Sequence, residues 1–213
     1  MADPAGAESL AALYIRELTE GVGPSRQRPA VIKLAIGTDA HSAFGSRLIK
    51  AAELAADETA APVLAHTDAV GGDLLLGRLT ALGVPAHRII IGHCCGTDDH
   101  AYHRRIAEGG AYLGFDRFGL EQIQSDDVRI AGMHKLVADS FEQQMVVSHD
   151  CAFCQRGQLF PGEGLYTNPM HYSLVIVPRL SALGVERATL DMILTDNPRR
   201  YFSGGHPCRS GET

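Results

Sequence analysis

Four side chains suited to metal or carbonyl chemistry lie within or directly after short apolar runs. They are Lys33, His66, His93 and Asp150, and the runs cover residues 29–37, 63–65, 89–92 and 145–149. A parallel strand that is buried on both faces has a nearly continuous apolar sequence. The carboxyl ends of such strands meet on one face of an α/β barrel, where active sites form. We therefore expect the four side chains to converge at one end of a parallel sheet.

Each of these residue types offers a defined chemistry. Burial would lower the pKa of Lys33, and a neutral amine can form a Schiff base, act as a base, or take up carbon dioxide as a carbamate that bridges two metal ions. Neutral imidazoles bind zinc well, and an aspartate can both ligate a metal and accept a proton from a metal-activated water. Simpler roles stay open: Lys33 can pair with a buried acid, the two histidines can be hydrogen-bonded core residues, and Asp150 can cap the next segment.

The order of predicted elements defines an α/β fold class. Apolar strands alternate with segments of helical periodicity, which predicts βαβ units and a parallel sheet. The strands are expected at 29–37, 63–66, 89–93, 111–115 and 145–150, and the helices at 9–22, 46–59, 72–82, 98–108, 125–140, 173–183, 185–194 and from 196 onward. A closed TIM-type barrel has eight strands. The sequence therefore predicts a partial (β/α)8 barrel of about five strands, with residues 1–213 as a single domain.

Local signals add detail to this outline. Ser46 and Ser125 are predicted N-caps, and the irregular stretch 151–170 has the length of a lid or binding loop. The acidic segment Glu121, Gln122, Asp126 and Asp127 is expected to face solvent. The pairs Cys94–Cys95 and Cys151/Cys154 follow two of the strands, so a thiolate zinc site is an alternative to plain reduced thiols.

Composition excludes several classes of function. The formal net charge of −6 argues against nucleic-acid binding, which needs a basic patch. No apolar run reaches the 18 residues of a membrane span, and the start of the chain lacks the basic and apolar segments of a secretory signal. An odd count of five cysteines favours reduced thiols and a cytoplasmic location.

Six segments together resemble the phosphotriesterase family of the amidohydrolase superfamily, and most of all its lactonase branch. They are Val31-Ile32-Lys33, His66-Thr67, Ile91-Gly92-His93, the run Gly114 to Gly119, Val147-Ser148-His149-Asp150 and the run Thr195 to Arg199. The resemblance covers about residues 10–203. It implies a (β/α)8 barrel with a binuclear metal centre. By this resemblance Lys33 is the carbamylated bridging ligand, and His66 and His93 hold the more exposed metal. Asp150 ligates the buried metal and shuttles a proton, and Arg117 lies near the substrate pocket.

The sequence also departs from that family. It has ten histidines but no His-x-His pair, the motif by which members hold the buried metal from their first strand. Gly96 stands where members often carry an acid. We therefore expect a metal-dependent hydrolase of lactones or phosphotriesters that binds at most about one zinc ion, has feeble activity or none, and associates as a homo-oligomer. The alternatives are an inactive barrel fragment or binding module with open sheet edges, and a Schiff-base aldolase using Lys33.

Overall fold

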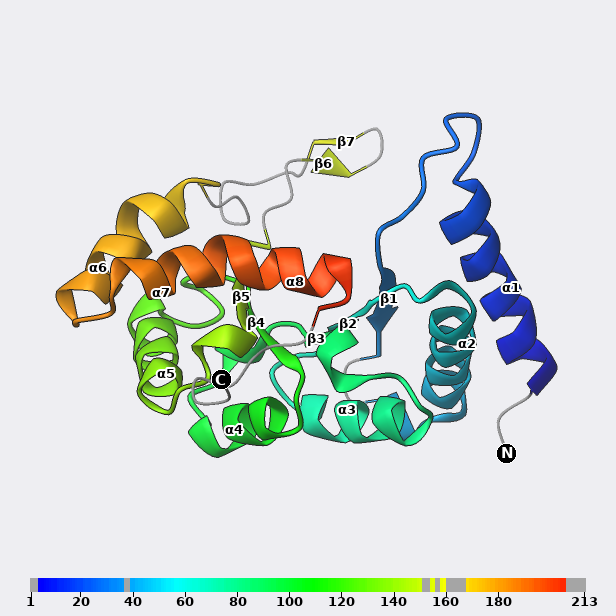
Figure 1. The fold of residues 1–213 in the computed structure, drawn as a ribbon, viewed down its shortest axis with the longest axis horizontal. Coiled ribbons are helices and arrows are strands. Elements are labelled where there is room, and N and C mark those ends of the chain that lie inside the picture. Colours follow the sequence, from blue (N-terminus) through cyan, green and yellow to red (C-terminus); the bar gives the residue numbers. More distant parts are fainter. Residues whose placement is uncertain (1–3, 37–38, 151–153, 156–157, 160–167, 206–213) are drawn as a thin grey trace.

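A five-stranded parallel sheet with the sequential order β1-β2-β3-β4-β5 forms the centre of the structure (Figure 1). The computed structural model describes residues 4–36, 39–150, 154–155, 158–159 and 168–205. The strands are β1 (Ile32–Ala35), β2 (Val63–His66), β3 (Ile89–Ile91), β4 (Tyr112–Phe115) and β5 (Met145–Val147). All four pairings are parallel, and helices lie in the connections. This arrangement is the wall of an α/β barrel, so the predicted α/β class and partial barrel are confirmed.

Helices surround this wall (Figure 1). They are α1 (Pro4–Glu20), α2 (Ala43–Thr59), α3 (Gly72–Ala81), α4 (His100–Glu108), α5 (Asp126–Ala138), α6 (Val177–Ala182), α7 (Arg187–Asp191) and α8 (Asn197–Ser203). Short 3₁₀ turns occupy Asp39–His41, Ala86–Arg88, Cys94–Gly96 and Glu142–Gln144. Within the stretch predicted to be irregular, β6 (Cys154–Gln155) and β7 (Gln158–Leu159) form an antiparallel pair. No helix among the described residues is long and apolar enough to cross a membrane.

One of the two predicted N-caps is confirmed and the other is wrong. The Ser125 side chain accepts the Val128 N–H at the start of α5. Helix α2 begins three residues earlier than predicted, because Ser42 has the extended backbone of a cap and accepts the Gly45 N–H. Ser46 lies inside α2, and its hydroxyl accepts from Arg78 of α3 at 3.1 Å.

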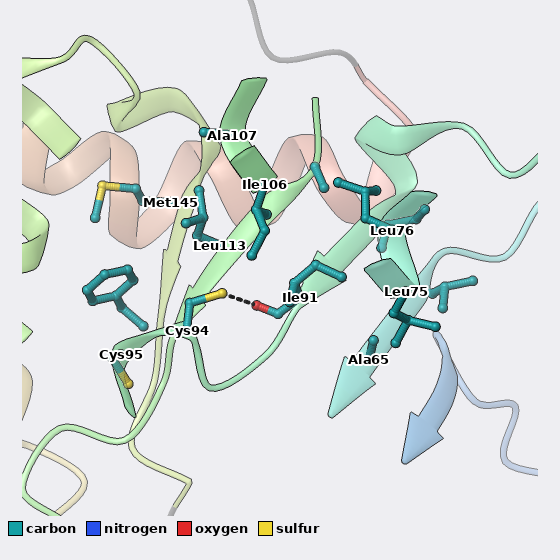
Figure 2. Packing of buried hydrophobic residues seen from close by; sticks show 14 of the residues in the cluster. Ala65, Leu75, Leu76, Ile91, Cys94, Cys95, Ile106, Ala107, Leu113 and Met145 are labelled. Atoms are coloured by element: carbon teal, nitrogen blue, oxygen red, sulfur yellow. Dashed lines mark hydrogen bonds between the residues drawn. The ribbon is translucent and has the colours of Figure 1, made fainter. Parts of the chain in front are cut away.

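The main hydrophobic core lies between the sheet and the outer helices. Ile91, Leu113 and Met145 point from the strands toward Leu75 and Ile106 of the helices, and all five are fully buried (Figure 2). Burying each such side chain stabilises the fold by about 1.5–3 kcal/mol. This packing holds the strand ends at fixed positions, as a site built on them requires.

The opposite, amino end of the sheet is closed by α8. The Asn197 side chain is fully buried and donates to the carbonyls of Glu142 and Met145, both at 2.7 Å, just before and within β5. Tyr201 packs edge-on against Tyr112 of β4, with ring centroids 5.7 Å apart, in a second apolar cluster that includes Ile90. The C-terminal helix thus fills the amino end of the barrel interior and leaves the carboxyl ends of the strands for chemistry.

The last two predicted helices form one continuous rod, in which a π-helical turn, Met192–Asp196, joins α7 to α8. A second π-helical turn, Tyr172–Ile176, leads into α6. Each π-helical turn is followed by a proline, Pro198 or Pro178, within the first two residues of the next helix. A proline ring clashes with the carbonyl four residues earlier in an α-helix. The wider turn accommodates both prolines, and at Pro198 the helix continues where the sequence indicated a break.

The prediction that Lys33 lies in a strand buried on both faces is wrong. β1 alternates, with Ile32 and Leu34 buried and Lys33 and Ala35 exposed. Lys33 and Ala35 are exposed because β1 is an edge strand that pairs only with β2. The inner face of β1 also has no opposite barrel wall among the described residues. Gly37, the last residue of the predicted run, lies outside the described residues.

Candidate functional site

A histidine pair stands at the carboxyl ends of β2 and β3. His66 ends β2, and its Nδ1 lies 2.7 Å from Nε2 of His93, with the two rings nearly perpendicular at 81°. Two hydrogen bonds hold the strand ends together. The Gly92 N–H donates to the Ala65 carbonyl at 2.7 Å, and the Thr67 hydroxyl donates to the Gly92 carbonyl at 2.9 Å. His93 has a left-handed backbone, φ 63°, which turns its ring toward His66.

Asp116, the first residue after β4, fixes the orientation of His93. Its Oδ1 lies 2.9 Å from the ring Nδ1, and its two oxygens accept the His93 backbone N–H at 3.0 and 3.1 Å. The other ring nitrogen, Nε2, is therefore the one that faces His66. Sequence analysis gave a role to Arg117 but missed Asp116. Strand alternation was the available signal, because Asp116 is two and four residues beyond Gly114 and Tyr112 and so shares their inner face.

Lys33 lies within electrostatic reach of this pair. Partial burial lowers the pKa of its amine, the carboxylates of Asp116 and Asp150 oppose that shift, and the Arg117 guanidinium adds to it. The Lys33 charge also acts on His66. An amine with a lowered pKa has a larger neutral fraction, which both carbamate and Schiff-base formation need.

His66 is held in the form that a metal ligand requires. Burial is the main cause of its lowered pKa, and the neighbouring His93 lowers the pKa further. The Asp68 carboxylate, 3.4 Å from the His66 Nε2, opposes the shift without reversing it. A histidine whose pKa lies below the ordinary value of about 6.5 is mostly neutral at pH 7, and only the neutral ring has the lone pair that a metal ion would bind.

Asp150 and Arg117 form an ion pair at the mouth of the site. The Arg117 Nε donates to Asp150 Oδ2 at 3.1 Å, and the Asp150 side chain is 45% exposed. The structure thus brings His66, His93 and Asp116 into direct contact, with Lys33 and the Arg117–Asp150 pair around them. It does not bring the Asp150 carboxylate against the histidines.

The histidine pair fits half of a metal site. Two imidazole nitrogens sharing one tetrahedral zinc would be roughly 3.3–3.4 Å apart, so the observed 2.7 Å needs only a small rotation of either ring. The donor set is short of protein ligands, because no group of three or more His, Cys, Asp or Glu in the described part of the chain is placed to hold a metal ion. Lys33 is the remaining candidate, and it becomes an oxygen ligand only as a carbamate.

The cysteines that the structure describes do not support a thiolate site. Cys94 and Cys95 are free and fully buried, and the Cys94 thiol donates to the Ile91 carbonyl (Figure 2). Burial raises the pKa of Cys94 well above its usual value and that of Cys95 to about 11. Both thiols are therefore protonated at neutral pH. Cys151 and the Cys154 side chain lie outside the described residues.

A buried ion pair anchors the loops around the site. Asp126, predicted to face solvent, is 3% exposed, because its carboxylate pairs with Arg129 at 2.8 Å and with His171 at 2.6 Å. It also accepts the Gly119 N–H at 3.0 Å, and Arg129 donates to the Leu120 carbonyl. The pair thus fastens the loop after β4 and the segment that enters α6.

Replacing Asp126 by asparagine is expected to lower the free energy of unfolding by about 2–3 kcal/mol, because charged hydrogen bonds are lost in a buried position. Burial would raise the Asp126 pKa, but the Gly119 N–H, His171 and Arg129 outweigh it and leave that pKa lowered. Its contribution to stability is therefore present above about pH 4, the ordinary value for aspartate, and is lost as pH falls through the lowered pKa.

Urea unfolding measured from pH 3 to pH 7 would check this. The matched control is Asp191→Asn, which removes an exposed pair between Arg187 and Asp191 and should change little. An Asp126 variant as stable as the wild type at pH 7 would show that this carboxylate is not an anchor.

The fold and the site define an α/β-barrel protein whose candidate centre lies at the carboxyl ends of its strands. The family model described as the phosphotriesterase family matches residues 2–202, and the chain belongs to that family. An aryldialkylphosphatase from Saccharolobus solfataricus is 28% identical over 204 residues, which cover 92% of this chain and 65% of that protein. A phosphotriesterase homology protein from Mycobacterium tuberculosis is 29% identical and is covered to 64%.

Solved structures give the same result. An organophosphorus hydrolase from Deinococcus radiodurans superimposes with a TM-score of 0.85 at 30% identity, over 92% of this chain and 62% of that one. A variant of a PTE-like lactonase from the same organism superimposes with a TM-score of 0.84. The chain spans just under two thirds of the length of these relatives. The resemblance inferred from the six segments is thereby confirmed.

Proposed function

We propose that this chain carries the greater part of a metal-dependent hydrolase site for ester-like small molecules, lactones or phosphotriesters. One observation supports this most: the facing nitrogens of His66 and His93 at the carboxyl ends of neighbouring strands, 2.7 Å apart. A structural histidine pair would not need a carboxylate behind one ring and a lysine with a lowered pKa beside it.

In this proposal His66, His93 and carbamylated Lys33 hold a divalent ion, with zinc suited to imidazole ligands. Such an ion, when bound, polarises the oxygen of an ester and makes a water molecule acidic near neutral pH. The lowered pKa of Lys33 supports the carbamate, because only a neutral amine takes up carbon dioxide. We expect about one bound ion per chain.

Asp150 and Arg117 have complementary roles in this proposal. The Asp150 Oδ2 accepts from Arg117, which holds the carboxylate at the mouth and leaves Oδ1 to take a proton from the attacking water. The Arg117 side chain is 13% exposed, and its remaining N–H groups can bind an oxygen of the substrate. The substrate is proposed to be a small neutral ester rather than a nucleic acid, and the free thiols of Cys94 and Cys95 support a cytoplasmic location.

The test is a hydrolysis screen of the zinc-loaded chain with bicarbonate present, using one lactone and one phosphotriester. A slow rate above that of the chelator-treated chain is expected, and it should fall in Asp150→Asn. Identical rates with and without zinc for both substrates would contradict the proposal.

A second candidate, association through open sheet edges, is supported by the edge of β1. The Ile32 N–H donates to the Pro62 carbonyl beside β2, so the backbone N–H groups of Lys33 and Ala35 point to the unpaired side. A cavity of about 200 Å³ lined by Tyr14, Leu18 and Val31 runs beside that edge. Unpaired strand edges invite pairing with a second chain, so we propose a homo-oligomer formed there.

Sedimentation velocity over a concentration series should then show dimers or larger species. Ala35→Pro is expected to shift the chain toward monomer, because it removes an outward N–H without breaking a bond to β2. A monomer at every concentration, or an unchanged association in a variant with wild-type circular dichroism, would rule out this edge as the interface.

A further inference from the structure

We propose that Asp116 is a positioning residue that keeps the proton of the His93 ring on Nδ1 and so presents the Nε2 lone pair toward His66. The inference rests on the proposed function only in its consequence, metal affinity. The arrangement itself is a property of the metal-free chain, and it assigns a role to a residue that the strand-end pattern did not indicate.

Three contacts from one carboxylate hold His93, one to its ring and two to its backbone nitrogen. Asp116 Oδ1 is 2.9 Å from the His93 Nδ1 and 3.0 Å from the His93 backbone nitrogen, and Oδ2 is 3.1 Å from that same nitrogen. The carboxylate has acceptors only, so the ring atom that it contacts must carry the hydrogen. The backbone N–H contacts hold the carboxylate beside the ring, and a ring flip would break the contact between Nδ1 and Oδ1.

The barrel wall is shaped to admit this carboxylate. A Cβ added to Gly114 would lie 2.9 Å from Asp116 Oδ2 and 3.0 Å from the Gly92 Cα, and a Cβ added to Gly92 would lie 3.3 Å from the same oxygen. Gly114 in β4 and Gly92, directly after β3, thus lack side chains where the carboxylate lies. The His93 side chain is only 5% exposed, so water cannot replace the acceptor easily.

This arrangement determines what the histidine pair can do. With its hydrogen on Nδ1, His93 offers an unprotonated Nε2 to His66 or to an ion between them. The opposite tautomer would place a hydrogen on the atom that faces His66 and block that position. Loss of a carboxylate partner behind a ligating imidazole typically lowers metal affinity about 10- to 100-fold.

The experiment compares the full chain with Asp116→Ala and Asp116→Asn. Long-range proton–nitrogen NMR correlations of the metal-free chain at pH 8 would identify the protonated nitrogen of His93, and zinc titration would give the affinity. We expect Nδ1–H in the wild type, a shift toward Nε2–H in Asp116→Ala with about 10- to 100-fold weaker zinc binding, and partial rescue in Asp116→Asn, which keeps a neutral acceptor. The control is Asp139→Ala, since Asp139 forms a 2.8 Å pair with His100, a histidine outside the strand-end pair; zinc affinity should not change.

Either of two results would overturn the role of Asp116: Nε2–H on His93 in the wild type, or unchanged zinc affinity in a folded Asp116→Ala chain. The first result needs no variant, so the tautomer can be measured even if the Asp116→Ala chain does not fold. A wild-type chain that binds no zinc would contradict the proposed function, yet the tautomer of His93 would still support or overturn this inference.

Discussion

Replacing His93 by alanine is expected to lower zinc affinity at least 100-fold, which is more than the loss of an outer-shell partner costs. His93 supplies one of two converging imidazole nitrogens, and no other described histidine lies beside His66 to replace it. The His93 side chain is 5% exposed. Its removal therefore leaves a small buried space, and no neighbouring side chain that the structure describes replaces the lost imidazole ligand. Competition titration against a zinc-binding dye would give the change.

His100→Ala is the matched control for this variant. His100 also contacts a carboxylate, with Nε2 lying 2.8 Å from Asp139 Oδ2, but it begins α4 and its partner follows α5. The zinc affinity of the His100→Ala chain should equal that of the wild type. Equal losses in the two variants would mean that zinc binds through scattered surface histidines.

Replacing Tyr201 by alanine is expected to lower the free energy of unfolding by about 3–5 kcal/mol, the usual cost of removing a fully buried aromatic ring. The ring fills the amino end of the barrel interior against Tyr112 and Ile90. Its loss leaves a cavity at the amino ends of the strands whose carboxyl ends carry the candidate site. Urea unfolding followed by circular dichroism would measure the change.

Two controls separate packing from other effects. Phe202, the next residue of α8, is 56% exposed, and its alanine variant should change stability by less than about 1 kcal/mol. Tyr201→Phe keeps the ring and removes a hydroxyl that has no hydrogen-bond partner among the described residues, so it should be nearly neutral. A Tyr201→Ala chain as stable as the Tyr201→Phe chain would contradict the conclusion that α8 fills the amino end of the barrel interior.

The sequence predicted the sheet because strand order and periodicity are local properties. Apolar runs at regular spacing gave all five parallel strands and the helices between them. The boundaries differed where one interaction decided the outcome, as with Ser42, which caps α2 in place of Ser46. The π-helical turn before Pro198 was not predictable either, because proline indicates a break unless a wider turn accommodates its ring.

The candidate site was predictable only in part. Strand ends indicated His66 and His93, and the structure places them in contact. The left-handed backbone of His93 and the carboxylate of Asp116 that fixes it arise from three-dimensional packing between β3 and β4. Burial was misjudged in both directions: Lys33 is exposed because its strand is an edge, and Asp126 is buried because Arg129 neutralises its charge.

The most direct test of the central claim, that the strand-end histidines form a metal-binding centre, is the zinc content of the purified chain after equilibration with zinc and bicarbonate and removal of the excess. We predict about one tightly held ion per chain, since three protein ligands suffice for a catalytic zinc site, and none in the His66→Ala, His93→Ala double variant. Zinc absent from the wild type, or retained in full by the double variant, would contradict the account.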